Sequence, residues 1–233
     1  MKATHEKAHA EVVAALRAIG NPERGEAIRL DRGSALQHLG IAFPALRARV
    51  KQDFSFTALP EVQVLEVWDA LWHHSPYGDV LFAALEFYAP LVRKPMRMKA
   101  PAGLWPVVQH WAERVDNWCH ADALAGLYSR LLQADPPAVL PQLQAWNASQ
   151  SPWLRRLSIT SLIHYSGKNA VFLPLAQMLP LLAACVPERR KPVEMALGWV
   201  LRELARVHPE SAAAFLAQHA PNMSARALAR ARE

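Results

Sequence analysis

Trp118 and Asp122 are the two residues whose types and spacing best suit chemistry. They lie four positions apart in the stretch VDNWCHADAL, which is about one turn of a helix, so an indole and a carboxylate would share one face. More Trp and Arg residues follow at a repeat-like spacing, Trp153 with Arg156 and Trp199 with Arg202. A carboxylate among indoles and guanidinium groups suits a polyanionic ligand that carries a local positive charge.

Sequence patterns typical of metal, nucleotide or acyl-transfer chemistry are missing. His73 and His74 are adjacent, as are Cys119 and His120, and neighbouring residues on a helix point about 100° apart. The sequence has no Cys-x-x-Cys or His-Glu-x-x-His motif, no Gly-rich phosphate loop and no Gly-x-Ser-x-Gly turn. We therefore expect neither a metal nor a cofactor.

The elements that position these residues are predicted to be helices. Residues 6–20 carry an apolar stripe at helical spacing that stops at Gly20, just before Asn21-Pro22. The sequence has no Asn-Gly or Asp-Gly pair and no alternating run rich in Val, Ile or Thr. With 52% hydrophobic residues and 18 Pro against 9 Gly, the chain is predicted to be all-α.

One helix-start pattern, a Pro three positions before a Gln, recurs along the chain. It occurs at Pro60, Pro106, Pro141 and Pro174, and Pro is favoured in a first helical turn. These prolines are 46, 35 and 33 residues apart, near the period of HEAT or armadillo helix pairs. The spacing predicts an α-solenoid of stacked HEAT-like antiparallel helix pairs, one domain over residues 1–233 with a concave face for a ligand.

The formal net charge of +6 is concentrated in two basic runs. The first comprises Arg189, Arg190, Lys191, Arg202, Arg206, Arg226, Arg230 and Arg232, and the second comprises Arg93, Lys94, Arg97 and Lys99. Such runs suit nucleic acid or an anionic membrane, or they are solvated faces that improve solubility. The C-terminal stretch 223–233 belongs either to a ligand-binding surface or to a frayed tail.

Cysteine content and hydropathy indicate a cytoplasmic, soluble protein. Cys119 and Cys185 are the two cysteines, too few for a disulfide framework of the secreted kind. No apolar segment follows the polar start, and no apolar run reaches the roughly 20 residues of a membrane span. We expect no membrane contact.

A set of motifs distributed over most of the chain resembles a known family. The motifs are Asn21-Pro22-Glu23, His38-Leu39-Gly40-Ile41 with Pro44 and Arg47, Val67-Trp68-Asp69, Trp118 to Asp122, Trp153-Leu154-Arg155-Arg156, and Gly198-Trp199-Val200-Leu201-Arg202-Glu203. Together they resemble the AlkD-type DNA alkylation repair family, glycosylases built from HEAT-like repeats. The last motif and the Trp–Asp spacing are the most specific.

The resemblance implies hydrolysis of the N-glycosidic bond of positively charged alkylated purines, of the 3-methyladenine and 7-methylguanine type, in duplex DNA. Asp122 would stabilise the positive charge that develops on the deoxyribose, and it would orient the attacking water. Trp118 and Trp199 would offer aromatic faces to the cationic nucleotide, while Arg156 would hold a phosphate. Further DNA contacts are expected from Arg155, Arg202, Arg190, Lys191 and Arg47. The resemblance also suggests a monomer associated with the nucleoid.

The chain departs from the family pattern at four positions. The family commonly has a Tyr and a Lys near Asp31 and Gly33, a Lys where Met195 stands, and often an Asp where Cys119 stands. Loss of basic groups weakens DNA contact or moves it elsewhere, so these changes bear on affinity and substrate range.

Other interpretations of the same residues stay open. One is a catalytically silent helical-repeat protein that binds damaged or branched DNA, and another is a protein-interaction scaffold. Arg156 could instead form a salt bridge between repeats, and Trp153 could pack between them. Five more tryptophans are expected in the core, namely Trp68, Trp72, Trp105, Trp111 and Trp146. The acid at Asp122 favours catalysis, because a pure DNA binder would do better without a negative charge facing phosphates.

Overall fold

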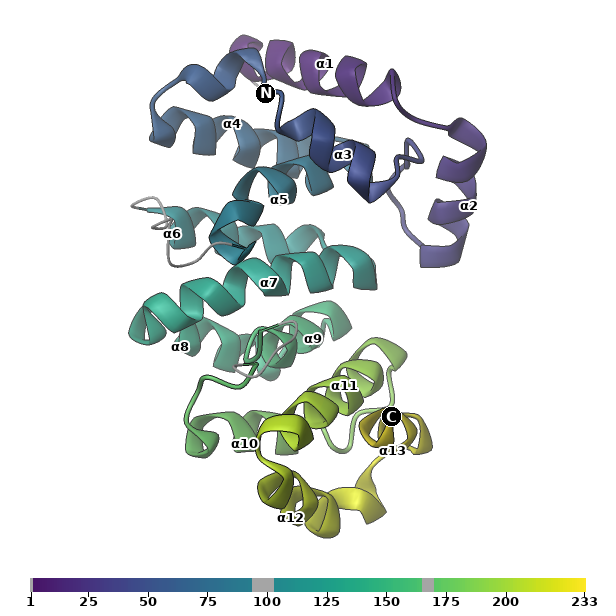
Figure 1. Cartoon of the computed structure of the whole chain (residues 1–233), viewed down its shortest axis with the longest axis vertical. Coiled ribbons are helices and arrows are strands. Elements are labelled where there is room, and N and C mark those ends of the chain that lie inside the picture. Colours follow the sequence, from purple (N-terminus) through teal and green to yellow (C-terminus); the bar gives the residue numbers. More distant parts are fainter. Residues whose placement is uncertain (1, 94–102, 165–169) are drawn as a thin grey trace. The chain divides into compact units, whose positions relative to one another are not determined.

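The computed structural model describes residues 2–93, 103–164 and 170–233. Within these residues the chain forms thirteen α-helices and three short 3-10 helices, and the only extended pairings are two isolated bridges (Figure 1). The all-α prediction is therefore confirmed. The chain divides into two compact units, residues 1–123 and 124–233, with the boundary inside helix α7. The single domain and the concave face stay predictions.

The first unit contains six helices and the beginning of a seventh. They are α1 (Ala3–Arg17), α2 (Pro22–Arg32), α3 (Phe43–Val50), α4 (Glu61–His74), α5 (Gly78–Arg93), α6 (Leu104–Val108) and the first turns of α7 (Trp118–Ala134), with 3-10 turns at Ser55–Ala58 and Gln109–Arg114. Helix α1 packs on α3, α4 and α5. Trp72 and Trp111 stack in the core with ring centroids 4.5 Å apart, and both indoles are fully buried.

Helix α2 illustrates how local sequence sets the helix ends. The Asn21 side chain accepts a hydrogen bond from the Arg24 N–H at 2.9 Å, and Pro22 occupies the first turn. Gly33 ends the helix with φ of 59°, a left-handed conformation that favours glycine. A backbone requirement thus explains the glycine at one of the positions where the chain departs from the family pattern.

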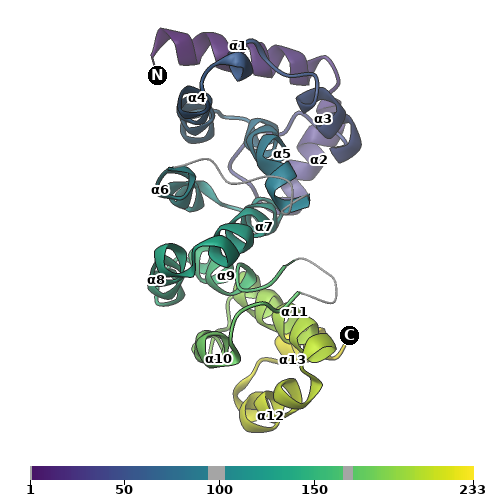
Figure 2. The same ribbon diagram turned by 60° about the vertical axis from the view of Figure 1, so that its left-hand side comes forward.

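The second unit contains the rest of α7 and the remaining helices. They are α8 (Pro136–Asn147), α9 (Pro152–Thr160), α10 (Leu175–Ala183), α11 (Lys191–Val207), α12 (Pro209–His219) and α13 (Ala225–Arg232), with a 3-10 turn at Ala220–Asn222. Figure 2 shows α8 and α10 on one side of this unit and α9 and α11 on the other. Helix α11 packs on α9, α12 and α13.

The C-terminal helix α13 is packed on α11 rather than frayed. Ala227 and Ala231 are buried, and Arg226 forms an ion pair with Glu194 of α11. A Cβ atom at Gly198 would lie 2.5 Å from the Ala227 carbonyl oxygen. Only glycine permits this approach of α13, so the glycine of the Gly198–Glu203 motif has a packing role.

The predicted helix starts are partly correct. Pro60 and Pro174 directly precede α4 and α10, and Pro106 lies in the first turn of α6. The prediction at Pro141 is wrong, because α8 begins at Pro136 and encloses Pro141. Asp135 caps that helix by accepting a hydrogen bond from the Ala138 N–H at 3.2 Å. The Asp-Pro pair was the true start signal.

The tryptophans expected in the core are mostly there. Trp68, Trp72, Trp111 and Trp146 are buried, whereas Trp105 is half-buried. Among the described residues, no helix has the length and apolar character needed to cross a membrane.

Candidate functional site

Trp118 and Asp122 lie one turn apart at the beginning of α7, in the first unit. Trp118 is the first residue of the helix and is 48% exposed, whereas Asp122 is only 8% exposed. The other seven tryptophans are buried or half-buried. Trp118 is therefore the indole whose aromatic surface is most accessible to a ligand.

Asn117 fixes the first turn of α7 from the residue just before it. Its Oδ1 accepts a hydrogen bond from the His120 backbone N–H at 3.1 Å, and its Nδ2 donates to His120 Nδ1 at 2.7 Å. His120 Nε2 is 3.0 Å from the Gly78 carbonyl oxygen at the start of α5. This pattern makes Nε2 the donor and Nδ1 the acceptor of a neutral imidazole. The start of α7 is thereby tied to the start of α5.

Asp116 ties the same turn to the segment that follows α2. Its carboxylate accepts hydrogen bonds from Ser34 Oγ at 2.8 Å, from the Ala35 N–H at 2.7 Å and from Asn117 Nδ2 at 2.7 Å. Burial alone would raise the pKa of Asp116, but these hydrogen bonds outweigh it and hold the pKa below its ordinary value. Three segments of the first unit therefore meet just before Trp118.

His120 is fully buried and stays neutral near pH 7. Burial lowers its pKa to about 4. Its ring lies 4.2 Å from the ring of Phe82 and 6.0 Å from that of His38, measured between centroids. His38 in turn lies 3.6 Å from the Asp79 carboxylate. These contacts hold the buried face of α7, whereas the Trp118 side chain is exposed to solvent.

Trp199 and Arg156 belong to the second unit, and both are nearly buried. Trp199 in α11 is 8% exposed and Arg156 in α9 is 6% exposed. Arg156 Nη1 donates a hydrogen bond to the Pro192 carbonyl oxygen at 2.7 Å, in the first turn of α11. The resemblance predicts a phosphate contact for Arg156, which stays a prediction, and the hydrogen bond to Pro192 shows that this side chain joins α9 to α11.

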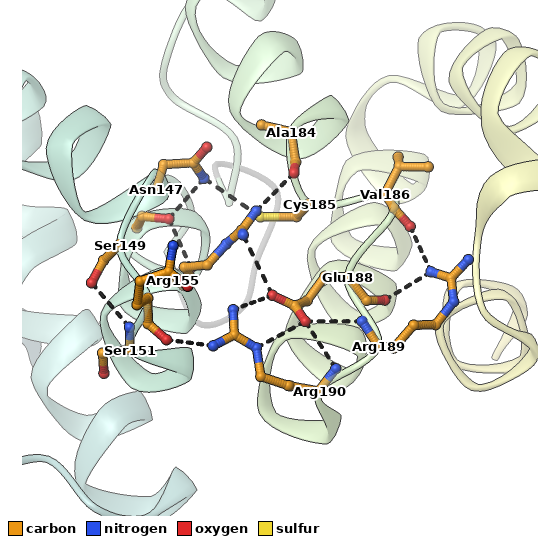
Figure 3. A network of polar contacts seen from close by, with 12 residues as sticks. Asn147, Ser149, Ser151, Arg155, Ala184, Cys185, Val186, Glu188, Arg189 and Arg190 are labelled. Atoms are coloured by element: carbon orange, nitrogen blue, oxygen red, sulfur yellow. Dashed lines mark hydrogen bonds and ion pairs between the residues drawn. The ribbon is translucent and has the colours of Figure 1, made fainter.

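Arg155 and Arg190 converge on Glu188, in the loop between α10 and α11 (Figure 3). Arg155 lies 3.4 Å from this carboxylate and donates to the Ala184 carbonyl oxygen at 2.8 Å. Arg190 donates from Nε at 2.9 Å and also through its terminal nitrogen. Hydrogen bonds from Arg190 lower the pKa of Glu188 to about 2, against the opposing effect of burial. Arg155 and Arg190, two of the expected DNA contacts, therefore form ion pairs with an acid of the same protein.

The remaining expected DNA contacts differ in their partners. Arg202 lies 3.3 Å from both Glu203 and Glu233, and Arg47 lies 3.3 Å from Glu86. Lys191 is exposed at the first position of α11. In the second basic run, Arg93 also pairs with Glu86, whereas Lys94, Arg97 and Lys99 lie outside the described residues.

Sequence reasoning missed the hydrogen-bonded residues that support Trp118, namely Ser34, Asp116, Asn117 and His120. A signal for one of them was available, because Asn is a preferred cap and Asn117 directly precedes the helix. The Ser34–Asp116 pair is separated by 82 residues and had no local signal. Within the described residues, no three His, Cys, Asp or Glu side chains gather closely enough to hold a metal ion.

Two solved structures share this fold. A predicted DNA alkylation repair enzyme from Enterococcus faecalis superposes with a TM-score of 0.73 at 15% identity, covering 91% of this chain and 94% of that chain. AlkD2 from Streptococcus mutans superposes with a TM-score of 0.54, also at 15% identity, covering 76% and 81% of the two chains. No curated protein matches the sequence. The likeness to the two structures concerns the fold.

A family match over almost the whole sequence identifies the class of this protein as that of DNA repair proteins. Residues 12–233 match the family described as DNA alkylation repair enzyme. The chain belongs to this family, which confirms the resemblance seen in its motifs, and family membership implies that it binds DNA.

Proposed function

We propose that this protein is a DNA glycosylase that removes positively charged alkylated purines from duplex DNA. The observation that carries the proposal is the pairing of an exposed indole, Trp118, with an acid one turn further along the same helix, Asp122. Family membership makes DNA the ligand. An indole attracts a cationic base by roughly 0.5–2 kcal/mol, while the carboxylate acts on the sugar.

Asp122 is assigned the central role in the reaction. Alkylation at N3 or N7 makes the purine a good leaving group, so bond cleavage needs no protonation of the base. As the C1′–N bond lengthens, positive charge develops on C1′ and O4′, and a fixed carboxylate stabilises it. Asp122 is only 8% exposed, and a carboxylate partly removed from water acts more strongly on a nearby charge. The same group orients the water that attacks C1′.

Trp199 and Arg156 are assigned supporting roles in the second unit. Trp199 offers a second aromatic face and Arg156 a guanidinium for the DNA backbone. Lys191, exposed at the first position of α11, is the expected flanking contact. Its charge makes binding depend on salt without reading base sequence.

A second candidate is a DNA-binding protein without catalytic activity. The ion pairs of Arg155 and Arg190 with Glu188 favour neither candidate function. Asp122 favours the enzyme, because a carboxylate turned toward phosphates weakens simple binding.

The test uses duplex DNA that contains 7-methylguanine and measures release of the free base. Wild type is expected to release it above the spontaneous rate, and Asp122→Asn to be slower by about 100- to 1000-fold. Asp53→Asn is the matched control, since it changes an exposed carboxylate of the same unit in the same way. DNA binding without release by wild type would support the second candidate, and equal rates for wild type and Asp122→Asn would remove Asp122 from catalysis.

A further inference from the structure

Arg32, the last residue of α2, carries a charge without an acidic partner among the described residues. Its guanidinium carbon lies 5.4 Å from the centroid of the Phe82 ring, in a cation–π contact. The side chain is only half-buried. Arg29, one turn earlier, differs in this respect, because it bonds both oxygens of Glu26 at 2.7 and 2.8 Å.

Two independent contacts place Arg32 beside the first turn of α7. Ser34 and Ala35, just after Arg32, bond to Asp116, just before Trp118, at 2.8 and 2.7 Å. The Phe82 ring beneath Arg32 also touches the His120 ring, with 4.2 Å between centroids. Arg32 is close enough that its charge adds to burial and His38 in lowering the pKa of His120.

The surroundings of Arg32 suit the backbone of a nucleic acid. The Phe43 ring forms a T-shaped contact with the same Phe82 ring, with 5.0 Å between centroids, and Phe43 is 41% exposed. Arg32 and Phe43 therefore place one cation and one accessible aromatic ring on Phe82, and the Phe82 ring contacts His120, two residues after Trp118 in α7. A guanidinium already held against an aromatic ring loses less conformational freedom when it binds a phosphate.

We propose that Arg32 binds a backbone phosphate of the DNA strand whose alkylated nucleotide contacts Trp118. This inference rests on the proposed function, since it uses DNA as the ligand. In this arrangement Phe82 is a positioning residue for the guanidinium. The cation at position 32 then supplies an electrostatic contact in the first unit, where Arg47 and Arg93 are paired with Glu86.

The test compares the salt dependence of binding to an unmodified duplex for wild type, Arg32→Gln and Arg29→Gln. Loss of one phosphate contact lowers the magnitude of the slope of log affinity against log salt by about 0.9. We expect this change for Arg32→Gln alone, because the charge of Arg29 is already balanced by Glu26. Arg32→Lys should keep the slope, since it keeps the charge.

The outcomes separate this inference from the function on which it rests. A slope for Arg32→Gln equal to that of wild type overturns the inference, and so does an equal fall for Arg29→Gln, which would indicate a general effect of net charge. In both cases base release by wild type would leave the glycosylase proposal standing. Wild type that does not bind DNA would instead overturn the proposed function. The urea midpoint of each variant confirms that binding is compared between folded proteins.

Discussion

Asn117 donates a hydrogen bond to Nδ1 of His120, 2.7 Å away in the interior of the first unit. The same side chain accepts from the His120 backbone N–H, so it holds the first turn of α7 at two points. The other ring nitrogen of His120 bonds to Gly78. Because both ring nitrogens are engaged, the imidazole has one tautomer and one orientation. Trp118 lies between the two partners in sequence, and its backbone is held from both sides.

Asn117→Ala is expected to destabilise the protein and to slow base release. The substitution removes a helix cap and leaves a buried ring nitrogen without its donor, at a cost of about 1–3 kcal/mol. Urea unfolding measures the first effect, and kcat and KM at a temperature where the variant is folded measure the second. The stability of Asn117→Ser, which keeps a capping oxygen, should lie between that of wild type and that of Asn117→Ala. An Asn117→Ala variant as stable as wild type would show that the network does not hold α7.

Trp118→Ala is expected to affect function far more than folding. The indole is 48% exposed, so its removal should change the free energy of unfolding by less than about 1 kcal/mol. Loss of the aromatic face should weaken binding of the cationic nucleotide by roughly 0.5–2 kcal/mol. Trp72→Ala is the matched control in the core and should cost about 3–5 kcal/mol of stability. A strongly destabilised Trp118→Ala variant would contradict a ligand-binding role.

The sequence predicted the helices and the Trp118–Asp122 pair because both depend on local spacing. The starts of α4 after Pro60 and of α10 after Pro174 required only the preference of proline for the beginning of a helix. Pro141 misled the prediction because a proline is tolerated inside α8 once Asp135 and Pro136 have started the helix. A proline shows where a helix can start, but in α8 the cap formed by Asp135 determines where the helix does start.

The supports of the site could not be predicted, because they join residues far apart in the chain. Ser34 meets Asp116, and Gly78 meets His120 across 42 residues. Glu188 was also missed, since a run of charged residues usually lies in solvent, and only the folded loop brings Arg155 to its carboxylate. The candidate residues Trp118 and Asp122 could thus be found in the sequence, but the long-range hydrogen bonds that support them could not.

Stability is expected to fall as the pH drops from about 6.5 to about 4. Burial lowers the pKa of His120, and likewise that of His164, from 6.5 to about 4 in the folded protein. In this interval the unfolded chain binds protons that the folded protein excludes, so each imidazole removes about 1.4 kcal/mol per pH unit. Urea unfolding between pH 7 and pH 4.5 measures the slope.

The His120→Gln variant tests which group causes this pH dependence. It should have a shallower slope than wild type, whereas His74→Gln, which changes an exposed ring, should not. The carboxylates whose pKa values are lowered, Asp79, Asp116 and Glu188, act at lower pH. Their stabilising effect is present above their ordinary pKa and is lost only as the pH falls below about 4. Equal slopes for wild type and His120→Gln would contradict the assignment.

Glu188→Gln is expected to destabilise the second unit and to strengthen nonspecific DNA binding. Removal of this charge leaves Arg155 and Arg190 without their acid, and because the Arg190 side chain is 37% exposed, the cost should be that of lost charged hydrogen bonds, about 1.5–3 kcal/mol. The released cations should steepen the salt dependence of DNA binding. Glu210→Gln, at an exposed acid of α12, is the control. An unchanged urea midpoint would show that Glu188 does not fix the loop.

Arg156→Gln should reduce both stability and DNA binding. The hydrogen bond from the guanidinium to Pro192 is charge-assisted, and its loss should cost about 1.5–3 kcal/mol. Loss of a phosphate contact should lower the magnitude of the salt slope by about 0.9. The two measurements are independent, so a stability loss with an unchanged slope would leave Arg156 as a structural residue and remove it from the DNA-binding residues.

The unequal exposure of the two candidate indoles has a consequence for how this protein can diverge. The exposed fraction is 48% for Trp118 and 8% for Trp199. Replacement of an exposed side chain disturbs little packing, so natural variation at position 118 can be selected for the lesions it admits. Replacement of Trp199 first changes the core around α11, and most variants there would be lost as poorly folded protein before their chemistry mattered. New substrate ranges should therefore arise at the start of α7, while α11 stays constant among descendants of this chain.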